Sequence, residues 1–157
     1  MKKQGFTLIE LMVVIVIMGI LAAVAVPKLF GMIAKSKASE VPTAAGTWIN
    51  LQDAYAAEKA DVGDWAAIGY EAPGAVNSAK NSSETSVIKY AGGAPANKSV
   101  SWTATPKSAL NDCTTSMNWQ LTATATATGI TVGTGSANNC TALTPSWTSL
   151  SRSAATN

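Results

Sequence analysis

The sequence of 157 residues contains no histidine, and charged side chains make up only 13% of it. Histidine is the most frequent general base in enzymes and the usual activator of serine and cysteine nucleophiles. The sequence also lacks glycine-rich phosphate-binding motifs and the H-E-x-x-H metal motif. Because its nine acidic residues are scattered without a shared spacing, we expect no enzyme activity, no cofactor and no metal site.

Basic residues and cysteines are also scarce. The formal net charge is only +2 at pH 7, and beyond the N-terminal pair the nearest approach to a basic cluster is Lys28, Lys35 and Lys37. Since DNA- and RNA-binding proteins gain much of their affinity by neutralising phosphates, we expect no nucleic-acid partner. The two cysteines are Cys113 and Cys140, and two thiolates without histidine do not make a zinc site.

What the sequence does contain is one long apolar run near its N-terminus. Sixteen consecutive apolar or glycine residues occupy positions 11–26, and the run extends back to Phe6 with only Thr7 and Glu10 as polar interruptions. As a helix this run would be about 31 Å long, close to the thickness of a bilayer's hydrocarbon core. No clean small-residue cleavage site follows it, as one would in a secretory signal. The boundary between polar and apolar residues, where a cleavage site is expected, lies before the run, at Gly5.

The segment KKQG followed by FTLIELMVV, residues 2–14, resembles the leader and first mature residues of type IV prepilins. The resemblance implies that prepilin peptidase cuts between Gly5 and Phe6 and that the new amine of Phe6 is N-methylated. It also implies a single-pass precursor in a bacterial inner membrane, which later meets the inner-membrane pilus assembly machinery. Removing Lys2 and Lys3 from a chain of formal charge +2 leaves a net charge of zero.

Glu10 is a carboxylate inside the apolar run, where a charge costs roughly 2.5 kcal/mol or more unless it is paired. The resemblance implies that Glu10 neutralises the amine of Phe6, on a neighbouring subunit or on its own chain, inside a filament. Burial points the same way, because a carboxylate and an ammonium in an apolar bundle each need a partner. The alternative is that Glu10 reaches the nearby membrane interface.

Prolines and glycines are expected to weaken the helix. Pro27 and Pro42 each lack an N–H and are expected to bend it. Gly19 and Gly31 flank Pro27, and each costs about 1 kcal/mol relative to alanine. In pilins the matching segment can lose helicity on assembly, which the resemblance carries over to roughly residues 19–31. The alternative is a helix that is permanently bent but intact.

Between residues 27 and 59 the pattern becomes amphipathic, which predicts a helix with one covered face. The apolar positions recur at intervals of three and four residues: Val41, Ala44, Trp48, Leu51 and Tyr55. The helix is expected to stop near residues 60–63, and residues 61–85 are expected to form an irregular connection.

Alternating patterns further on predict an antiparallel sheet of three or four strands. Short strand signals occur at residues 86–90, 98–104 and 130–132, and the clearest alternation spans residues 117–128. One face is apolar and is expected to pack on the helix, while the other carries polar side chains for solvent. The inward-facing positions are Met117, Trp119, Leu121, Ala123, Ala125 and Ala127.

In an exported domain, the pair Cys113 and Cys140 predicts a disulfide. Such a bond would contribute roughly 3–4 kcal/mol and would hold the polar C-terminal tail against the sheet. This arrangement resembles the disulfide-bounded C-terminal region that pilins expose on the filament surface. Two buried free thiols are the alternative.

Taken together, the patterns predict an α+β protein with the pilin fold, in which a long N-terminal helix packs on a small antiparallel sheet. Residues 1–5 are expected to be the leader peptide. Residues 6–60 are expected to form the helix, with its membrane or filament-core half at 6–28. Residues 61–157 are expected to form a globular head with a disulfide-bounded C-terminal region.

The resemblance implies a structural subunit, the major pilin, that polymerises into a helical surface filament for adhesion and motility. A pseudopilin of a type II secretion system shares the N-terminal motif. The cysteine pair favours the pilin, because major pseudopilins typically have a calcium-holding loop and no disulfide. A third hypothesis is a filament adhesin that binds polysaccharide through exposed tryptophans. The candidates for that role are Trp65, Trp102, Trp119 and Trp147.

Overall fold

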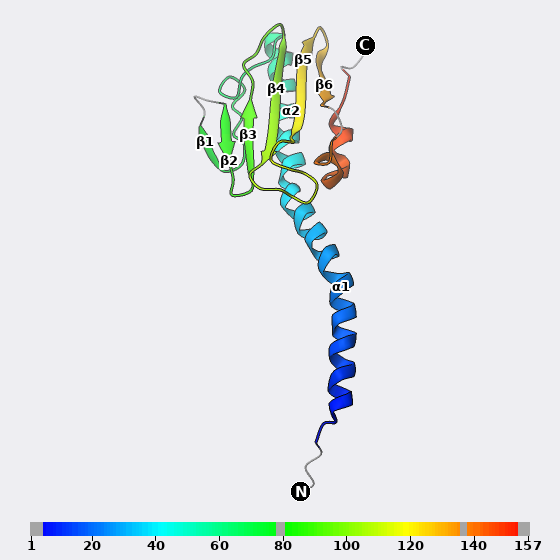
Figure 1. Ribbon diagram of the computed structural model, residues 1–157. Helices are drawn as coiled ribbons and strands as arrows, with labels where there is room; N and C mark the ends of the chain where they lie inside the picture. Colours follow the sequence, from blue (N-terminus) through cyan, green and yellow to red (C-terminus); the bar gives the residue numbers. More distant parts are fainter. Residues whose placement is uncertain (1–4, 78–80, 136–137, 154–157) are drawn as a thin grey trace. The chain divides into compact units, whose positions relative to one another are not determined.

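The structure, a computed structural model, describes residues 5–77, 81–135 and 138–153. The chain forms two compact units, residues 1–33 and residues 34–157. Figure 1 labels the helices and strands along the chain. The elements are α1 (Leu8–Ala38), α2 (Glu40–Lys59), β1 (Ala75–Asn77), β2 (Ser82–Glu84), β3 (Ile88–Gly92), β4 (Ser99–Pro106), β5 (Trp119–Thr126), β6 (Gly129–Thr134) and the 3₁₀ helices η2 (Thr141–Leu143) and η3 (Pro145–Leu150).

The unit of residues 1–33 consists of the first part of α1 and the residues before it. Its large apolar side chains, from Phe6 to Ile33, are all exposed. The helical segment is long and apolar enough to cross a membrane, and none of its most apolar window is buried in the structure. Helix α1 continues through Pro27 without interruption.

The helix is interrupted at Ser39, inside the unit of residues 34–157. The amide of Ser39 donates to the carbonyl of Ser36 at 3.3 Å, and its hydroxyl donates to the same oxygen at 2.7 Å. Helix α2 then begins at Glu40, so Pro42 lies in its first turn, where a missing N–H costs least.

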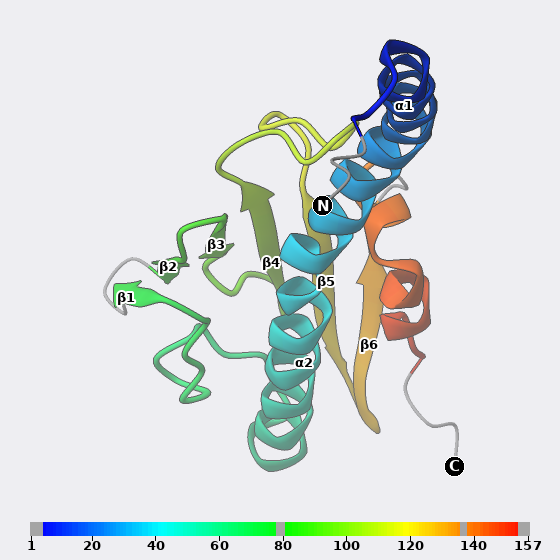
Figure 2. The ribbon, with the colours of Figure 1, turned by 90° about the horizontal axis from the view of Figure 1, so that it is seen from below.

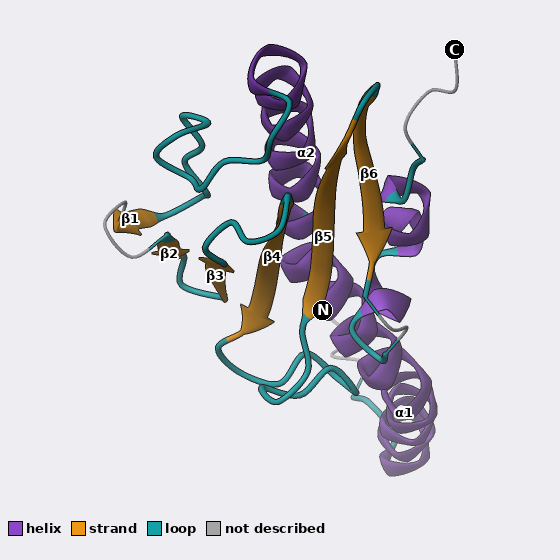
Figure 3. Ribbon diagram, turned by 90° about the horizontal axis from the view of Figure 1, so that it is seen from above, coloured by secondary structure: helices purple, strands orange, loops and turns teal. Residues whose placement is uncertain are grey.

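Helix α2 covers one face of the sheet, as Figure 3 shows, and contacts β5, β6 and η3. Val41, Ala44 and Trp48 of the predicted apolar stripe are buried, and Leu51 and Tyr55 pack at its margin. The helix ends at Lys59 because Ala60 adopts a left-handed backbone conformation, which stops further helical hydrogen bonding. The predicted helix-on-sheet fold is therefore confirmed.

Within the described residues the sheet has six antiparallel strands in the order β1 to β6, and Figure 2 shows it from the end opposite to that of Figure 3. The expectation of three or four strands was therefore wrong. The extra strands, β1 and β2, lie in the segment that was expected to be irregular. Each has only three residues, and β1 is exposed throughout, so neither carries the apolar alternation by which a strand is recognised.

Strands β4 and β5 supply most of the sheet's buried face. Their side chains alternate between buried positions and half-exposed or exposed ones along both strands, as the sequence predicts for β5. The prediction fails at Ala127, which was expected to face inward but is exposed in the turn after β5. The alanines Ala123 and Ala125 leave room for α2, while Trp102 and Trp119 fill the space around it. The Cys113–Cys140 disulfide is formed, which confirms the predicted bond, and joins the β4–β5 loop to the start of η2.

Candidate functional site

The predicted cleavage site is accessible in the structure. Phe6 is 86% exposed, and the space that a side chain at Gly5 would occupy holds no atom within 4 Å. The peptide between these residues can therefore enter a protease groove without unfolding any other element.

Glu10 is bound by Thr7, three residues before it, at the start of α1. The amide of Thr7 donates to Glu10 Oε2 at 2.9 Å, and its hydroxyl donates to the same oxygen at 2.7 Å. The amide of Glu10 in turn donates to Thr7 Oγ1 at 3.4 Å. This is a capping box, which satisfies amides that a helix N-terminus leaves unpaired.

The capping box was missed in the sequence analysis, although the spacing T-x-x-E is its signature. It gives the carboxylate of Glu10 two hydrogen bonds within its own chain. Both bonds from Thr7 end on Oε2, and no donor to Oε1 is found among the described residues.

The predicted weak segment of α1 is helical in the structure, and Gly19, Pro27 and Gly31 all lie inside α1. Beside Pro27 the helix surface has an apolar hollow of about 310 Å³. A hollow of this kind suits an apolar side chain from another helix. Its lining residues are Ala25, Val26, Lys28, Leu29 and Met32.

The tryptophans do not form a surface for stacking on sugars. All five are at most 1% exposed: Trp48, Trp65, Trp102, Trp119 and Trp147. Four of them, Trp65, Trp102, Trp119 and Trp147, were proposed as an exposed adhesive surface, and that hypothesis is wrong for the folded chain. The physical reason is that the rings pack together: Trp102 lies 6.5 Å from Trp48 and 6.2 Å from Trp147, centroid to centroid.

Two tyrosine hydroxyls connect α2 to the sheet beneath this aromatic cluster. Tyr70 donates to the carbonyl of Ala44 at 3.1 Å and accepts from the indole of Trp102 at 3.2 Å. Burial raises the pKa of Tyr70 to about 12. Tyr90 donates to the Glu40 carboxylate at 3.0 Å. Burial, together with the negative charge of Glu40, raises the pKa of the Tyr90 hydroxyl as well.

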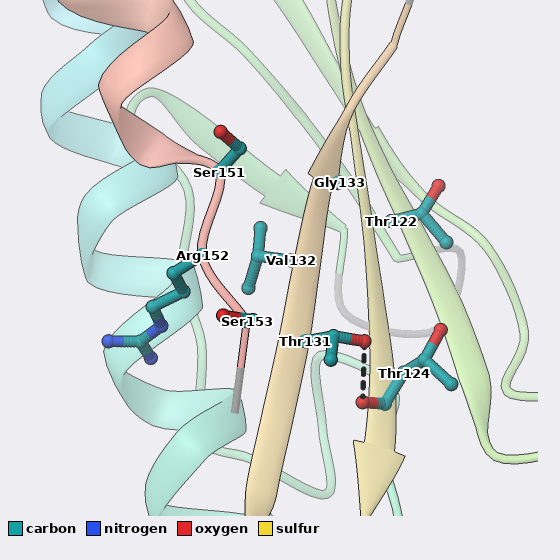
Figure 4. Close-up of a pocket in the computed structure, with 8 residues that line it drawn as sticks. All are labelled: Thr122, Thr124, Thr131, Val132, Gly133, Ser151, Arg152 and Ser153. Atoms are coloured by element: carbon teal, nitrogen blue, oxygen red, sulfur yellow. Dashed lines mark hydrogen bonds between the residues drawn. The ribbon is translucent and has the colours of Figure 1, made fainter. Parts of the chain in front are cut away.

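A shallow hollow of about 520 Å³ lies along β5 and β6 beside the C-terminal residues (Figure 4). Most of its lining side chains are hydroxyls or aliphatic, and none is a carboxylate, thiol or imidazole. The guanidinium of Arg152 points away from the strands and lies 3.2 Å from Asp53 on α2. The hollow therefore offers no general base. Its lining residues are Thr122, Thr124, Thr131, Val132, Gly133, Ser151, Arg152 and Ser153.

Residues 1–26 match the family model described as the prokaryotic N-terminal methylation motif. The chain is 48% identical over 58 residues to the type IV major pilin protein PilA of Myxococcus xanthus, which is 37% of this chain and 24% of that protein. It is 52% identical over 44 residues to the type IV major fimbrial protein FimA of Dichelobacter nodosus, 28% of each. A 44-residue match to the fimbrial protein EcpC of Eikenella corrodens is 54% identical, over 28% of this chain and 29% of that protein. The chain thus spans about a quarter of the length of these relatives.

Proposed function

We propose that this chain, which carries the N-terminal motif of the type IV pilins, is the repeating structural subunit of a type IV pilus. The observation that supports this most directly is the exposed apolar segment of residues 6–33, helical from Leu8, with Glu10 near its start. An exposed apolar surface of this extent needs lipid or other protein around it. A pilus subunit meets both in turn. Lipid surrounds the helix while the precursor is in the membrane, and the helices of neighbouring subunits surround it in the filament.

The proposed pathway of the subunit has three stages: cleavage, storage in the membrane and assembly. Prepilin peptidase removes residues 1–5 by cutting after Gly5, and Phe6 becomes the N-methylated first residue. The subunit waits in the inner membrane as a single-pass protein, with residues 6–28 in the bilayer. The assembly machinery then extracts it, and residues 61–157 form the outer surface of the filament, where adhesion and motility arise.

Pairing between Phe6 and Glu10 orders the subunits in this proposal. In the filament core the Phe6 ammonium of one subunit meets Oε1 of Glu10 on its neighbour. Each group alone costs several kcal/mol in apolar surroundings, and together they offset that cost. Since the two groups are four residues apart in the sequence, with Glu10 in the first turn of α1, their pairing between copies fixes the axial stagger.

Residues 19–31 give the helix a place to adapt during assembly. Pro27 removes one helical hydrogen bond, and Gly19 and Gly31 lower helix propensity on either side of it. The segment is helical in the single subunit, and we expect it to lengthen or lose helicity when α1 packs among copies. Pro42 belongs to the separate break at Ser39. The role is structural and needs no catalytic residue or cofactor.

The test is to shear the bacteria that make this protein and to take intact masses of the released material, with and without reductant. The expected mass is that of a chain beginning at N-methylated Phe6, two hydrogens lighter before reduction. Processed chain that stays in the cell envelope would favour the pseudopilin of a secretion system. A chain that still carries residues 1–5 would overturn the proposal.

A further inference from the structure

The ion pairs within the unit of residues 34–157 leave two groups of opposite charge without partners. Among the described residues, the ion pairs are Lys59 with Glu58, Lys107 with Glu84 and Arg152 with Asp53. Lys35 and Lys37 are exposed in the last turn of α1 and belong to none of these pairs. Asp61 and Asp64, just beyond the end of α2, belong to none either.

The lysines and the aspartates lie at opposite ends of this unit. Helix α2 separates them with 20 residues, a length of about 30 Å. The aspartates lie at the end where α2 stops, which in Figure 1 is also the end of the β5–β6 turn. The lysines precede the other end of α2. We call these the acidic end and the basic end.

The acidic end keeps free carboxylate oxygens. Asp61 accepts the amide of Val62 with Oδ1 at 2.8 Å, and Asp64 accepts the amide of Ala67 with Oδ1 at 2.9 Å. The second oxygen of each is not used among the described residues. Lys98 lies at this end too, since its carbonyl accepts the amide of Ala125 in β5, but the two aspartates outnumber it.

The dipole of α2 adds to this polarity, because a helix is positive at its N-terminus and negative at its C-terminus. Glu40 does not cancel the basic end, since its carboxylate is held inside by Tyr90 and Thr85. The exposed Asp112, in the loop between β4 and β5, also lies at the basic end and in none of the ion pairs, but Lys35 and Lys37 outnumber it. Among the described residues, the unit therefore has an excess of positive charge at one end and of negative charge at the other, with the helix dipole in the same sense.

We propose that Lys35 and Lys37 of one copy form ion pairs with Asp61 and Asp64 of another copy stacked on it end to end. The inference rests on the proposed function, because only a filament of parallel subunits brings the basic end of each unit onto the acidic end of another. A head-to-tail contact of this kind uses two different surfaces and propagates without closing. Each pair is solvent-exposed and weak, but it recurs at every subunit and is screened by salt.

The test is charge exchange in the full chain. Lys35→Glu with Lys37→Glu should abolish sheared filaments, because two like-charged ends then meet. Asp61→Lys with Asp64→Lys should do the same. All four substitutions together should restore filaments, since the pairs re-form with reversed sign.

Asp61→Asn with Asp64→Asn keeps both Oδ1 acceptors and should give filaments that fragment at lower salt than wild type.

Lys98→Glu is the matched control, because it makes the same change of charge at the acidic end. It should leave filament yield unchanged. If the four-fold exchange fails to restore filaments, if the lysine reversals have no effect, or if Lys98→Glu is as damaging as they are, the pairing is overturned. Wild-type cells that yield processed protein but no filament would instead overturn the proposed function. Circular dichroism of each purified variant separates loss of assembly from loss of folding.

Discussion

At the scale of single residues, Glu10 has two partners at two stages. In the isolated subunit its carboxylate caps its own helix through Thr7, and in the proposed filament it faces the amine of Phe6. Capping needs only an acceptor oxygen, whereas pairing with an ammonium needs a negative charge. Glutamine has the first property and lacks the second, so the two roles are separable.

Glu10→Gln should therefore leave leader processing and membrane insertion intact but abolish filament assembly. The amide oxygen still accepts from Thr7, while the Phe6 ammonium loses several kcal/mol of compensation in apolar surroundings. The measurement is the ratio of processed chain in sheared material to processed chain in membranes. Thr7→Ser keeps the hydroxyl and should assemble normally. Wild-type filament yield from Glu10→Gln would show that the charge is unnecessary.

A second residue-scale feature is the contact of Gly92 with the indole of Trp65. A Cβ at Gly92 would overlap the ring nitrogen and its neighbours, and Trp65 is only 1% exposed. The ring belongs to the core and has no free space to move into. Glycine is therefore required at this position by space rather than by backbone conformation.

Gly92→Ala should destabilise the fold by about 1–3 kcal/mol, the usual cost of overpacking. For a chain of this size the melting temperature would fall by roughly 3–10 °C. Gly133→Ala is the control, since nothing lies within 4 Å of its Cβ position, and should melt within a degree or two of wild type. Equal melting of both variants would contradict the assigned contact.

At the scale of elements, tyrosine hydroxyls fasten α2 to the sheet. Tyr70 reaches the second turn of α2 at Ala44, and Tyr90 of β3 reaches the first residue of α2, Glu40. Both hydroxyls must stay protonated to donate. Their raised pKa values mean that the folded state binds these protons more tightly than the unfolded chain does.

Stability should accordingly be fully present below pH 10 and decline as the pH rises through 10 towards the pKa of Tyr70, about 12. The two-unit rise corresponds to about 3 kcal/mol at most for this buried group. The measurement is urea unfolding followed by tryptophan fluorescence between pH 8 and 11.5. Tyr70→Phe should be less stable at pH 8 but lose less between pH 8 and 11.5. A parallel decline in both proteins would contradict the role given to Tyr70.

The elements that the sequence predicts well are those with long periodic patterns. The period-two alternation of residues 117–128 gives β5, and the intervals of three and four from Val41 give the buried side of α2. Strands β1 and β2 could not be predicted from the sequence, because three residues are too few to show a period. β1 pairs with β2 and β2 pairs with β3, so both depend on β3, which β4 in turn holds in the sheet.

The burial of the tryptophans could be predicted from the sequence only in part. The alternation already placed Trp102 and Trp119 on inward faces, but Trp65 lies outside any periodic segment. Its burial in the structure and its edge-to-face contact with Tyr70, 5.0 Å between ring centroids, show that it belongs to the core. Contacts of this kind join residues by topology, which local sequence does not reveal.

At the scale of the whole molecule, the buried core lies entirely within residues 34–157. Every buried apolar residue from Ala34 to Trp147 belongs to that unit, whereas residues 6–33 bury none of their large apolar side chains. Among the described residues, α1 therefore contributes Ala34 and Ala38, in its last turn, to the buried core. The exposed apolar residues 6–33 are left for assembly in the proposed filament.

A fragment of residues 34–157, exported to an oxidising compartment, should fold as a soluble monomer with the Cys113–Cys140 bond formed. Its melting temperature should match that of the globular transition of the full chain in detergent, within a few degrees. It should not polymerise, because the apolar helix is missing. Near-ultraviolet circular dichroism, sedimentation and intact mass measure the three properties. A fragment that is unfolded would show that residues before Ala34 contribute to the core.

The pairing of Arg152 with β6 has a consequence for solubility at high concentration. The amide of Val132 donates to the carbonyl of Arg152 at 2.7 Å, and the amide of Arg152 donates back at 3.0 Å. These bonds cover the middle of the β6 edge with a segment of backbone, while the guanidinium itself turns away to Asp53. Open edges recruit other strands and drive aggregation, and a segment that covers the edge opposes this. In the proposed filament, where globular units crowd together, the bridge keeps adjacent filaments from fusing through their sheets.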